Sequence, residues 1–84
     1  MAETKSDESI AFGQAVREAR KSLGLSQDEF AEISELHRTY VGGIERGERN
    51  PTLSSIWKIA HALQILPEVL IANAHKLLRE GTYK

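Results

Sequence analysis

The sequence has no cysteine, only two prolines, and no apolar run near the roughly 18 residues that a membrane-spanning helix requires. The absence of cysteine excludes disulfide bonds and thiolate metal sites, and it fits an intracellular protein. Apolar residues make up 40% of the chain and charged residues 27%, which is the balance of an ordinary soluble globular protein. We therefore expect a cytoplasmic protein without a membrane segment. A chain of 84 residues can close only one apolar core, so we expect one domain.

The N-terminal stretch MAETKSDES is polar and acidic. A secretory signal instead has a basic stretch followed by an apolar one, so this segment is not interpreted as a signal. We interpret residues 1–9 as a flexible N-terminal arm and residues 10–80 as the domain.

Charge is unevenly distributed along the chain, although the formal net charge is only −1. Residues 1–36 carry four basic and eight acidic side chains, whereas residues 37–50 carry three basic and two acidic ones. Residues 51–84 carry four basic and two acidic side chains. This polarity permits a less acidic surface to approach a polyanion such as DNA, but it does not require one.

Apolar residues recur at helical spacing in five segments, and no segment alternates as a strand would. The sequence therefore predicts an all-α fold of five helices. The signals for helix starts and ends are Gly24, Ser26 with Glu29, Gly47, Thr52, Pro67 and Gly81. In the second helix, which should end near Ser34, we expect Phe30, Ala31 and Ile33 to face the core.

The third predicted helix has a core side and an outer side. At about 100° per residue, Val41 and Ile44 share one face, with Glu45 near it, whereas Thr39, Gly43 and Arg46 lie opposite. Glycines inside a helix cost about 1 kcal/mol each relative to alanine, so their presence needs a compensating role. An outer face without Cβ atoms at its glycines would let the helix lie deep in the major groove of DNA, about 12 Å wide. Packing against another helix is the alternative explanation for these glycines.

The stretch GLSQDEFAEISELHRTYVGGIERGERNPTLSSIWKIAHAL resembles the Xre/Cro/C1-type helix-turn-helix, the lambda-repressor-like fold of five helices found in phage and bacterial transcription regulators. The resemblance covers about residues 12–70. Within that group, HRTYVGGIERGERN is similar to the controller proteins of restriction–modification systems. The resemblance implies sequence-specific binding of double-stranded DNA by the second and third helices, without a metal or other cofactor.

The resemblance also implies roles for individual residues. Gln27 matches a residue that contacts the DNA backbone and braces the recognition helix, and Arg38 and Thr39 match positions that reach base edges. Arginine recognises guanine O6 and N7, whereas threonine offers a hydroxyl or meets a thymine methyl. Tyr40 has two interpretations, a DNA contact or a half-buried core aromatic. Arg46 is expected to contact phosphate or a base, and Arg49 and Asn50 are expected to contact phosphate.

An unpaired Glu45 carboxylate on the inner side of the third helix would be unfavourable. The family pairs this glutamate with an arginine of the first helix, which implies an Arg20–Glu45 ion pair here. Two positions depart from the family pattern. Glu35 stands where the turn usually has glycine, and His37 stands where the helix usually has a serine or threonine cap.

A single short recognition helix reads too few base pairs, so proteins of this kind bind palindromic half-sites as two-fold dimers. The helix at about 67–79 is the expected dimerisation helix because it is more apolar than one side of a terminal helix needs to be. Trp57 and Ile65 are expected to border it. The predicted interface residues are Val69, Leu70, Ile71, Ala74, Leu77 and Leu78. Completion of the monomer core is the alternative role for this apolar set.

Other classes of function fit the sequence less well than a DNA-binding regulator. His37, His61 and His75 lack the spacing of a metalloprotease, and the chain has no nucleophile elbow and no phosphate loop, so an enzyme is not expected. An antitoxin or a phage-type repressor, which binds DNA and a protein partner, is the main alternative. We therefore expect a homodimeric transcription regulator that acts by occupying an operator near a promoter. Direct contact with RNA polymerase is a second route by which it could act.

Overall fold

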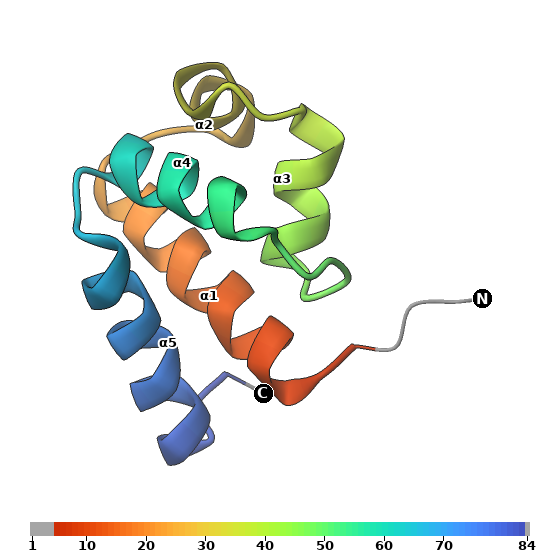
Figure 1. Ribbon diagram of the computed structural model, residues 1–84, viewed down its shortest axis with the longest axis vertical. Helices are drawn as coiled ribbons and strands as arrows, with labels where there is room; N and C mark the ends of the chain where they lie inside the picture. The colour runs from red at the N-terminus through yellow and green to blue at the C-terminus, as the bar shows by residue number, and fades with distance from the viewer. Residues whose placement is uncertain (1–4, 84) are drawn as a thin grey trace.

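The computed structural model describes residues 5–83, which form five α-helices and no strand. The helices are α1 (Asp7–Ser22), α2 (Gln27–Ser34), α3 (Arg38–Glu45), α4 (Leu53–Leu63) and α5 (Pro67–Glu80). The all-α prediction with five helices is confirmed. Figure 1 shows α2 and α3 together at one end of the molecule, with most of α5 at the other.

Local sequence signals determine most helix ends. The Ser26 hydroxyl accepts a hydrogen bond from the Glu29 backbone N–H, and the Glu29 carboxylate accepts one from the Ser26 N–H, which completes the predicted capping box. The Thr52 hydroxyl caps α4 in the same way through Ser55. Gly47 follows α3 with a φ of 76°, the left-handed conformation that glycine adopts without strain.

The turn between α2 and α3 forms despite the two departures noted above. Glu35 adopts the left-handed conformation, with φ of 60° and ψ of 32°, which is unfavourable for a residue with a Cβ atom. His37 precedes α3 but gives no side-chain cap. Both departures are therefore accommodated at a cost in stability.

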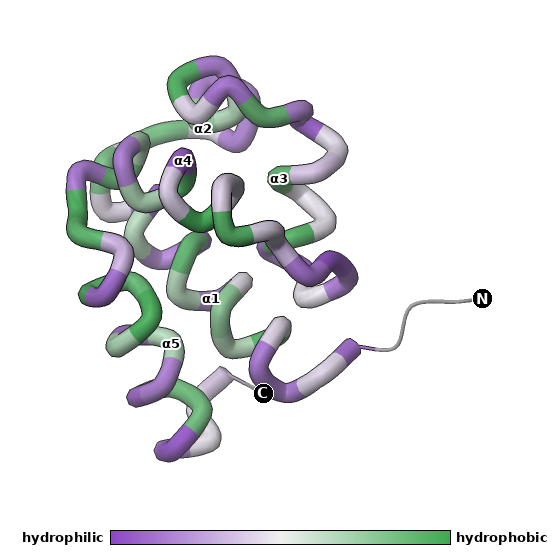
Figure 2. The backbone as a smooth tube through the Cα atoms, in the orientation of Figure 1, coloured by the Kyte–Doolittle hydropathy of each residue, from purple (hydrophilic) through white to green (hydrophobic). Residues whose placement is uncertain are grey.

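The α1 helix is the centre of the packing, because α3, α4 and α5 all contact it. The core is made of apolar side chains from all five helices. Its largest fully buried members are Phe30, Ile44, Ile59, Leu70, Val16 and Val41. Figure 2, coloured by hydropathy, shows apolar positions on α1 and on the helices around it.

Two predictions about the elements were wrong. Residues 7–9 are not part of an arm, because Ser6 caps α1 and the helix begins at Asp7, and Ser9 is buried. Of the rest of the predicted arm, residues 5 and 6 lead into the helix, and residues 1–4 lie outside the described residues. Ile33 was expected to face the core, but its side chain is 51% exposed. The third buried residue of α2, beside Phe30 and Ala31, is Ser34.

Among residues 5–83 no single helix has the length and apolarity to cross a membrane. The α4 and α5 helices reach that threshold only when taken together, and they are bent by 96° relative to each other.

Candidate nucleic-acid interface

The outer side of α3 is exposed and basic. Val41, Ile44 and Glu45 are buried, whereas Arg38, Thr39 and Arg46 are exposed, as the helical angles predict. The α3 helix contacts α1 and α2 on its inner side and lies at the edge of the molecule (Figure 1). The exposed side chains of Arg38, Thr39 and Arg46 are therefore accessible to a large ligand.

The two glycines of α3 are covered by arginine side chains. A Cβ on Gly42 would lie 2.9 Å from Arg46 Nη1 and 3.1 Å from Arg38 Nη1. A Cβ on Gly43 would lie 2.7 Å from Cγ of Arg49. The prediction that the outer side of the helix is left uncovered at Gly43 needs correction, because Gly43 is buried, and the atoms nearest its missing Cβ belong to the Arg49 side chain. No neighbouring helix is among the nearest atoms at either glycine, so helix packing does not explain them.

A buried ion pair holds α3 against α1. Arg20 Nε donates to Glu45 Oε2 at 2.7 Å, and Arg20 Nη2 donates to Glu45 Oε1 at 3.0 Å. The Arg20 side chain is 8% exposed and that of Glu45 3%, so this pair is shielded from solvent. Arg20 Nη1 also donates to the backbone oxygen of Leu25 at 2.7 Å, which ties the pair to the start of the helix-turn-helix. The expected Arg20–Glu45 pair is thus present and fixes the orientation of α3.

Gln27 joins this network from the first turn of α2. Its Nε2 donates to Glu45 Oε1 at 2.8 Å, so the side chain links α2 to the last residue of α3. This contact is the bracing that the resemblance implied. Within the described residues, no buried polar side-chain atom lacks a hydrogen-bond partner.

The loop after α3 is anchored to the start of α1. Ser9 Oγ donates to Asn50 Oδ1, and Ser9 in turn accepts from Ser6 Oγ at 2.9 Å. Arg49 and Asn50 are both exposed, which leaves them at the surface beside α3. Sequence reasoning missed Ser9, because a serine early in a helix gives no signal of a contact 41 residues away.

Tyr40 has a structural contact as well as some exposure. It is half-buried, packs against the core, and donates a long hydrogen bond of 3.4 Å to Ser55 Oγ on α4. Tyr40 therefore lies at the boundary between the core and the exposed side of α3.

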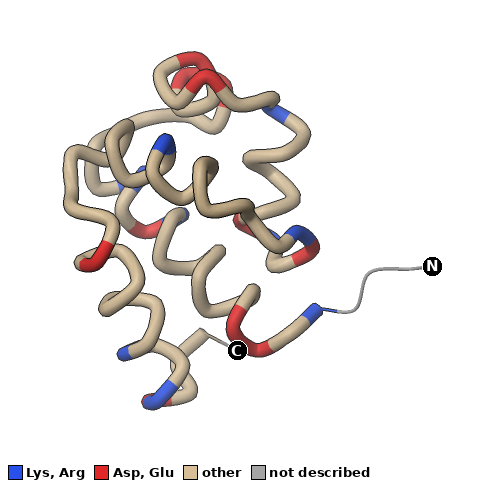
Figure 3. The backbone as a smooth tube through the Cα atoms, in the orientation of Figure 1, with Lys and Arg blue, Asp and Glu red and all other residues tan. Residues whose placement is uncertain are grey.

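Acidic side chains lie next to the basic ones. Arg38 Nε is 3.0 Å from Asp28 Oδ1, and Arg46 Nε is 3.0 Å from Glu48 Oε1. Glu48 is also 4.0 Å from Lys5 Nζ. Figure 3 shows acidic positions on α2 and on the loop after α3, next to basic ones. Sequence reasoning missed Asp28 and Glu48 as neighbours of these arginines. For Asp28 the only signal was its opposite charge, whereas Glu48 also stands two residues from Arg46.

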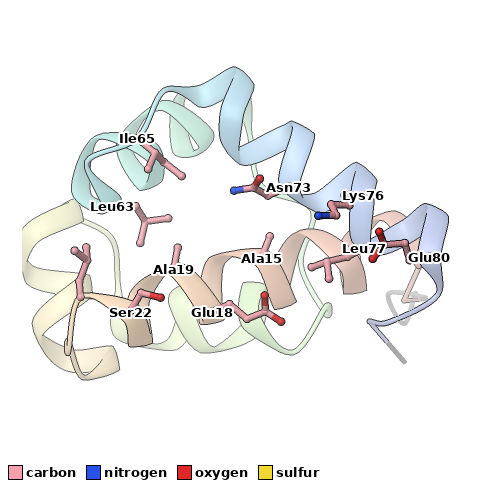
Figure 4. A pocket seen from close by; sticks show the side chains of 11 residues that line it. Ala15, Glu18, Ala19, Ser22, Leu63, Ile65, Asn73, Lys76, Leu77 and Glu80 are labelled. Carbon is pink, nitrogen blue, oxygen red and sulfur yellow. The ribbon is translucent and has the colours of Figure 1, made fainter.

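The predicted dimer residues divide into core and surface. Leu70 and Ala74 are 0% and 8% exposed and belong to the core. Leu70 is therefore not accessible to a second copy, which corrects its assignment to an interface, whereas Ala74 also lines the second groove described below. Leu77 is half-buried and lines a groove of about 550 Å³ between α1 and α5, seen in Figure 4 with Ala15, Asn73 and Lys76. This groove has mixed polar and apolar walls.

A second, more apolar groove of about 280 Å³ lies on the other flank of α5. Its apolar lining comes from α1, α4, α5 and the loop after α3. The apolar residues are Ala11, Phe12, Pro51, Ile56, Ile71, Ala74 and Leu78. Ile71 is 46% exposed, whereas Val69, which does not line this groove, is 40% exposed. We call this set the α5 groove.

Other apolar side chains are exposed at the α4 side of the molecule. Leu53, Trp57 and Leu66 are 73%, 59% and 60% exposed. Ile65, expected to border the dimer surface with Trp57, is half-buried and packs against the core. No group of three or more His, Cys, Asp or Glu residues among the described residues could hold a metal ion.

Comparison with protein families gives a match over most of the domain. A family described as "Helix-turn-helix" matches residues 16–70, which is more than half of the chain. A control protein, C.SmaI of Serratia marcescens, is 52% identical over 66 residues, covering 77% of this chain and 79% of the relative.

Two solved structures are similar in both fold and sequence. The restriction–modification controller protein C.AhdI of Aeromonas hydrophila has a TM-score of 0.76 and 49% identity, and the match covers 77% of this chain and 98% of C.AhdI. The controller protein C.Esp1396I, solved as a tetramer in complex with its natural 35-base-pair operator, has a TM-score of 0.80 and 30% identity. That match covers 87% of this chain and 96% of C.Esp1396I. C.SmaI, C.AhdI and C.Esp1396I are all described as control or controller proteins, which is a regulatory class.

Proposed function

Because the chain belongs to the helix-turn-helix family and, within it, to the control proteins of restriction–modification systems, we propose that it binds a double-stranded DNA operator and regulates transcription. The observation that carries the proposal is the outer side of α3. On this side, arginine side chains cover the two glycines of α3. On the inner side, the hydrogen-bond network of Arg20, Glu45 and Gln27 holds the helix against α1 and α2. Controller protein C.Esp1396I, which is similar over 87% of this chain, has been solved on its operator.

The proposed contacts divide into two kinds. Arg38 and Thr39, in the first turn of α3, would reach base edges in the major groove. Arg46 would bind a base edge or a phosphate, and Arg49 and the exposed edge of Asn50 would bind phosphates beside the groove, since most protein–DNA hydrogen bonds go to the backbone. A further phosphate would lie at the N-terminus of α2, where Gln27 and backbone N–H groups meet the positive helix end. Tyr40 would flank the base-reading residues while keeping its contact to Ser55.

Selection from random duplexes, followed by binding measurements, tests this function. We expect a palindromic site, and we expect Arg38→Ala to lose about 1–3 kcal/mol of discrimination at one position of each half-site. Arg79→Ala, which removes an exposed arginine from the last turn of α5, is the matched control and should bind like the original protein. An equal loss on operator and on random DNA would mean that Arg38 holds only phosphate. Absence of any saturable complex would overturn the function.

We also propose that two copies associate through the α5 groove. Its apolar lining includes Ile71 and Leu78 of α5, which are partly exposed, and the groove borders the loop that carries Arg49 and Asn50. A two-fold contact there would bring the loops of two copies near each other. That arrangement suits half-sites about one turn of DNA apart. The occupant we propose is therefore a second copy of this chain.

Two variants on opposite flanks of α5 test this interface. Ile71→Glu would put a charge into the α5 groove, whereas Val69→Glu puts the same charge on a residue of similar exposure outside it. We expect sedimentation to give dimers for the original protein and Val69→Glu at tens of micromolar, and monomers for Ile71→Glu. If Val69→Glu were monomeric and Ile71→Glu dimeric, the interface would lie on the Val69 side of α5 instead. If the original protein were monomeric, the proposal of association would be wrong.

Regulation through RNA polymerase is a separate part of the proposal. The protein would act in the cytoplasm by occupying an operator near a promoter, with direct polymerase contact as a second route. In vitro transcription from templates in which the operator is shifted by half a helical turn separates the two. Activation that depends on helical phase supports contact, and an effect independent of phase supports occupancy alone.

A further inference from the structure

Two guanidinium groups converge above Gly42. Arg38 Nη1 and Arg46 Nη1 lie 3.1 Å and 2.9 Å from one point, the position that a Cβ of Gly42 would occupy. The two arginines come from opposite ends of α3, and the absence of a side chain at Gly42 leaves room for both. Two like charges at this separation repel each other, so other charges must favour the arrangement.

Each guanidinium is held at its Nε edge by a carboxylate. Asp28, from the first turn of α2, is 3.0 Å from Arg38 Nε, and Glu48, from the loop, is 3.0 Å from Arg46 Nε. The side chains of Asp28 and Arg38 are 83% and 50% exposed. Ion pairs as exposed as these add little to stability. What they do is occupy the Nε atom of each guanidinium, so that the Nη atoms are the donors left to bind a ligand.

The two carboxylates are unfavourable for general affinity to DNA. Each lies next to residues proposed to approach a polyanion, where it repels phosphate and occupies an arginine edge that could bind one. With the Nε atoms of Arg38 and Arg46 paired in this way, one Nη atom of each lies close to the same point above Gly42. A ligand with two neighbouring hydrogen-bond acceptors could bind these Nη donors. Guanine presents such a pair, O6 and N7, in the major groove.

We propose that Asp28 and Glu48 are specificity-determining positioning residues. They hold Arg38 and Arg46 so that the Nη edges receive guanine acceptors, and they weaken binding to DNA that lacks a guanine at that place. This inference rests on the DNA-binding function proposed above. Phosphate oxygens offer similar acceptor chemistry, and the experiment distinguishes the two sources.

The experiment compares two neutralised carboxylates on α2. Asp28→Asn removes the ion pair to Arg38, whereas Glu32→Gln removes the same charge from an exposed residue that makes no ion pair within residues 5–83. The probes are the duplex that the original protein selects from random DNA and a scrambled duplex of the same composition. Affinities are measured over a range of salt concentrations, and thermal melting checks that each variant is folded.

For Asp28→Asn, we expect binding to scrambled DNA to strengthen beyond the Glu32→Gln control. The salt dependence on that DNA should steepen by about one unit in log–log slope, because the released Arg38 can neutralise one more phosphate. The preference for the selected duplex should fall by about tenfold, and a guanine facing Arg38 should become less required. Glu48→Gln should have the same effect through Arg46.

Three results would overturn the inference. If Asp28→Asn matches Glu32→Gln on both duplexes, the carboxylate acts only through net charge. If it strengthens binding to both duplexes by one larger factor, Arg38 meets phosphate, and Asp28 merely competes with it. If the original protein selects no sequence at all, the proposed function fails, and this inference fails with it.

Discussion

The carbonyl oxygen of Ile44 in α3 occupies the space that a Cβ on Gly13 of α1 would need. The carbonyl oxygen of Glu45 lies 2.8 Å from the same point, so two backbone groups face the glycine. Since these atoms belong to the last turn of α3, Gly13 determines how closely the recognition helix approaches α1.

Gly13→Ala should therefore destabilise the fold. Alanine favours the helix by about 1 kcal/mol, but the methyl group meets backbone, which cannot rotate away, and overpacking of this kind costs about 1–3 kcal/mol or more. Urea unfolding measures the change. Gly24→Ala is the comparison, because its φ of 72° is unfavourable for alanine but nothing lies within 4 Å of the new methyl. A Gly13→Ala protein as stable as the original would contradict the close approach.

Glu45→Ala should lower both stability and DNA affinity. Removing one partner of a buried pair leaves the Arg20 guanidinium without its counter-charge, at a cost of about 3–5 kcal/mol. Gln27→Ala removes one hydrogen bond to the same carboxylate and should cost only about 1–3 kcal/mol. A double-mutant cycle with Arg20→Ala measures the coupling. Unchanged melting temperature and affinity in Glu45→Ala would reject the structural role of the pair.

Glu35→Gly should stabilise the protein by about 1 kcal/mol, because glycine adopts the left-handed conformation without strain. Gln64, at the end of α4, has a nearly identical φ of 62°, so Gln64→Gly serves as a matched test away from the helix-turn-helix. Thermal melting should rise in both variants, with operator affinity unchanged. A loss of stability would show that the gain in unfolded-chain entropy exceeds the relief of strain.

Gly42→Ala should separate stability from binding. The new methyl meets only the ends of two flexible side chains, Arg38 and Arg46, which can move. Stability should rise by up to about 1 kcal/mol, since alanine is the better helix former. DNA affinity should fall by about tenfold because both guanidinium groups are displaced. Equal operator affinity in the variant and the original protein would mean that the arrangement above Gly42 is not used.

The capping box predicts a pH effect at the start of α2. The backbone N–H and the hydroxyl of Ser26 hold the pKa of Glu29 below its usual value near 4.5. A depressed pKa in the folded state means that this contribution to stability is complete above the unfolded pKa and is lost as the pH falls through the folded one. An NMR titration should find Glu29 more acidic in the native protein than in urea. A higher native pKa would contradict the capping box.

The sequence determined the features that depend on neighbouring residues. Helix caps and ends act through contacts within about four residues, so Ser26, Thr52 and Gly47 located α2, α4 and the end of α3. The helical angles also placed Val41 and Ile44 inward and Arg46 outward, because the period of the helix alone decides opposite faces.

Only the tertiary structure decided the features that depend on distant segments. Whether an apolar residue is buried depends on which helix lies against it, and for this reason Leu70 and Ala74 belong to the core while Ile33 is exposed. The pairing of Arg38 above Gly42 depends on Asp28 of α2, whose carboxylate reaches α3 only after the chain has folded, whereas Glu48 stands only two residues from its partner Arg46.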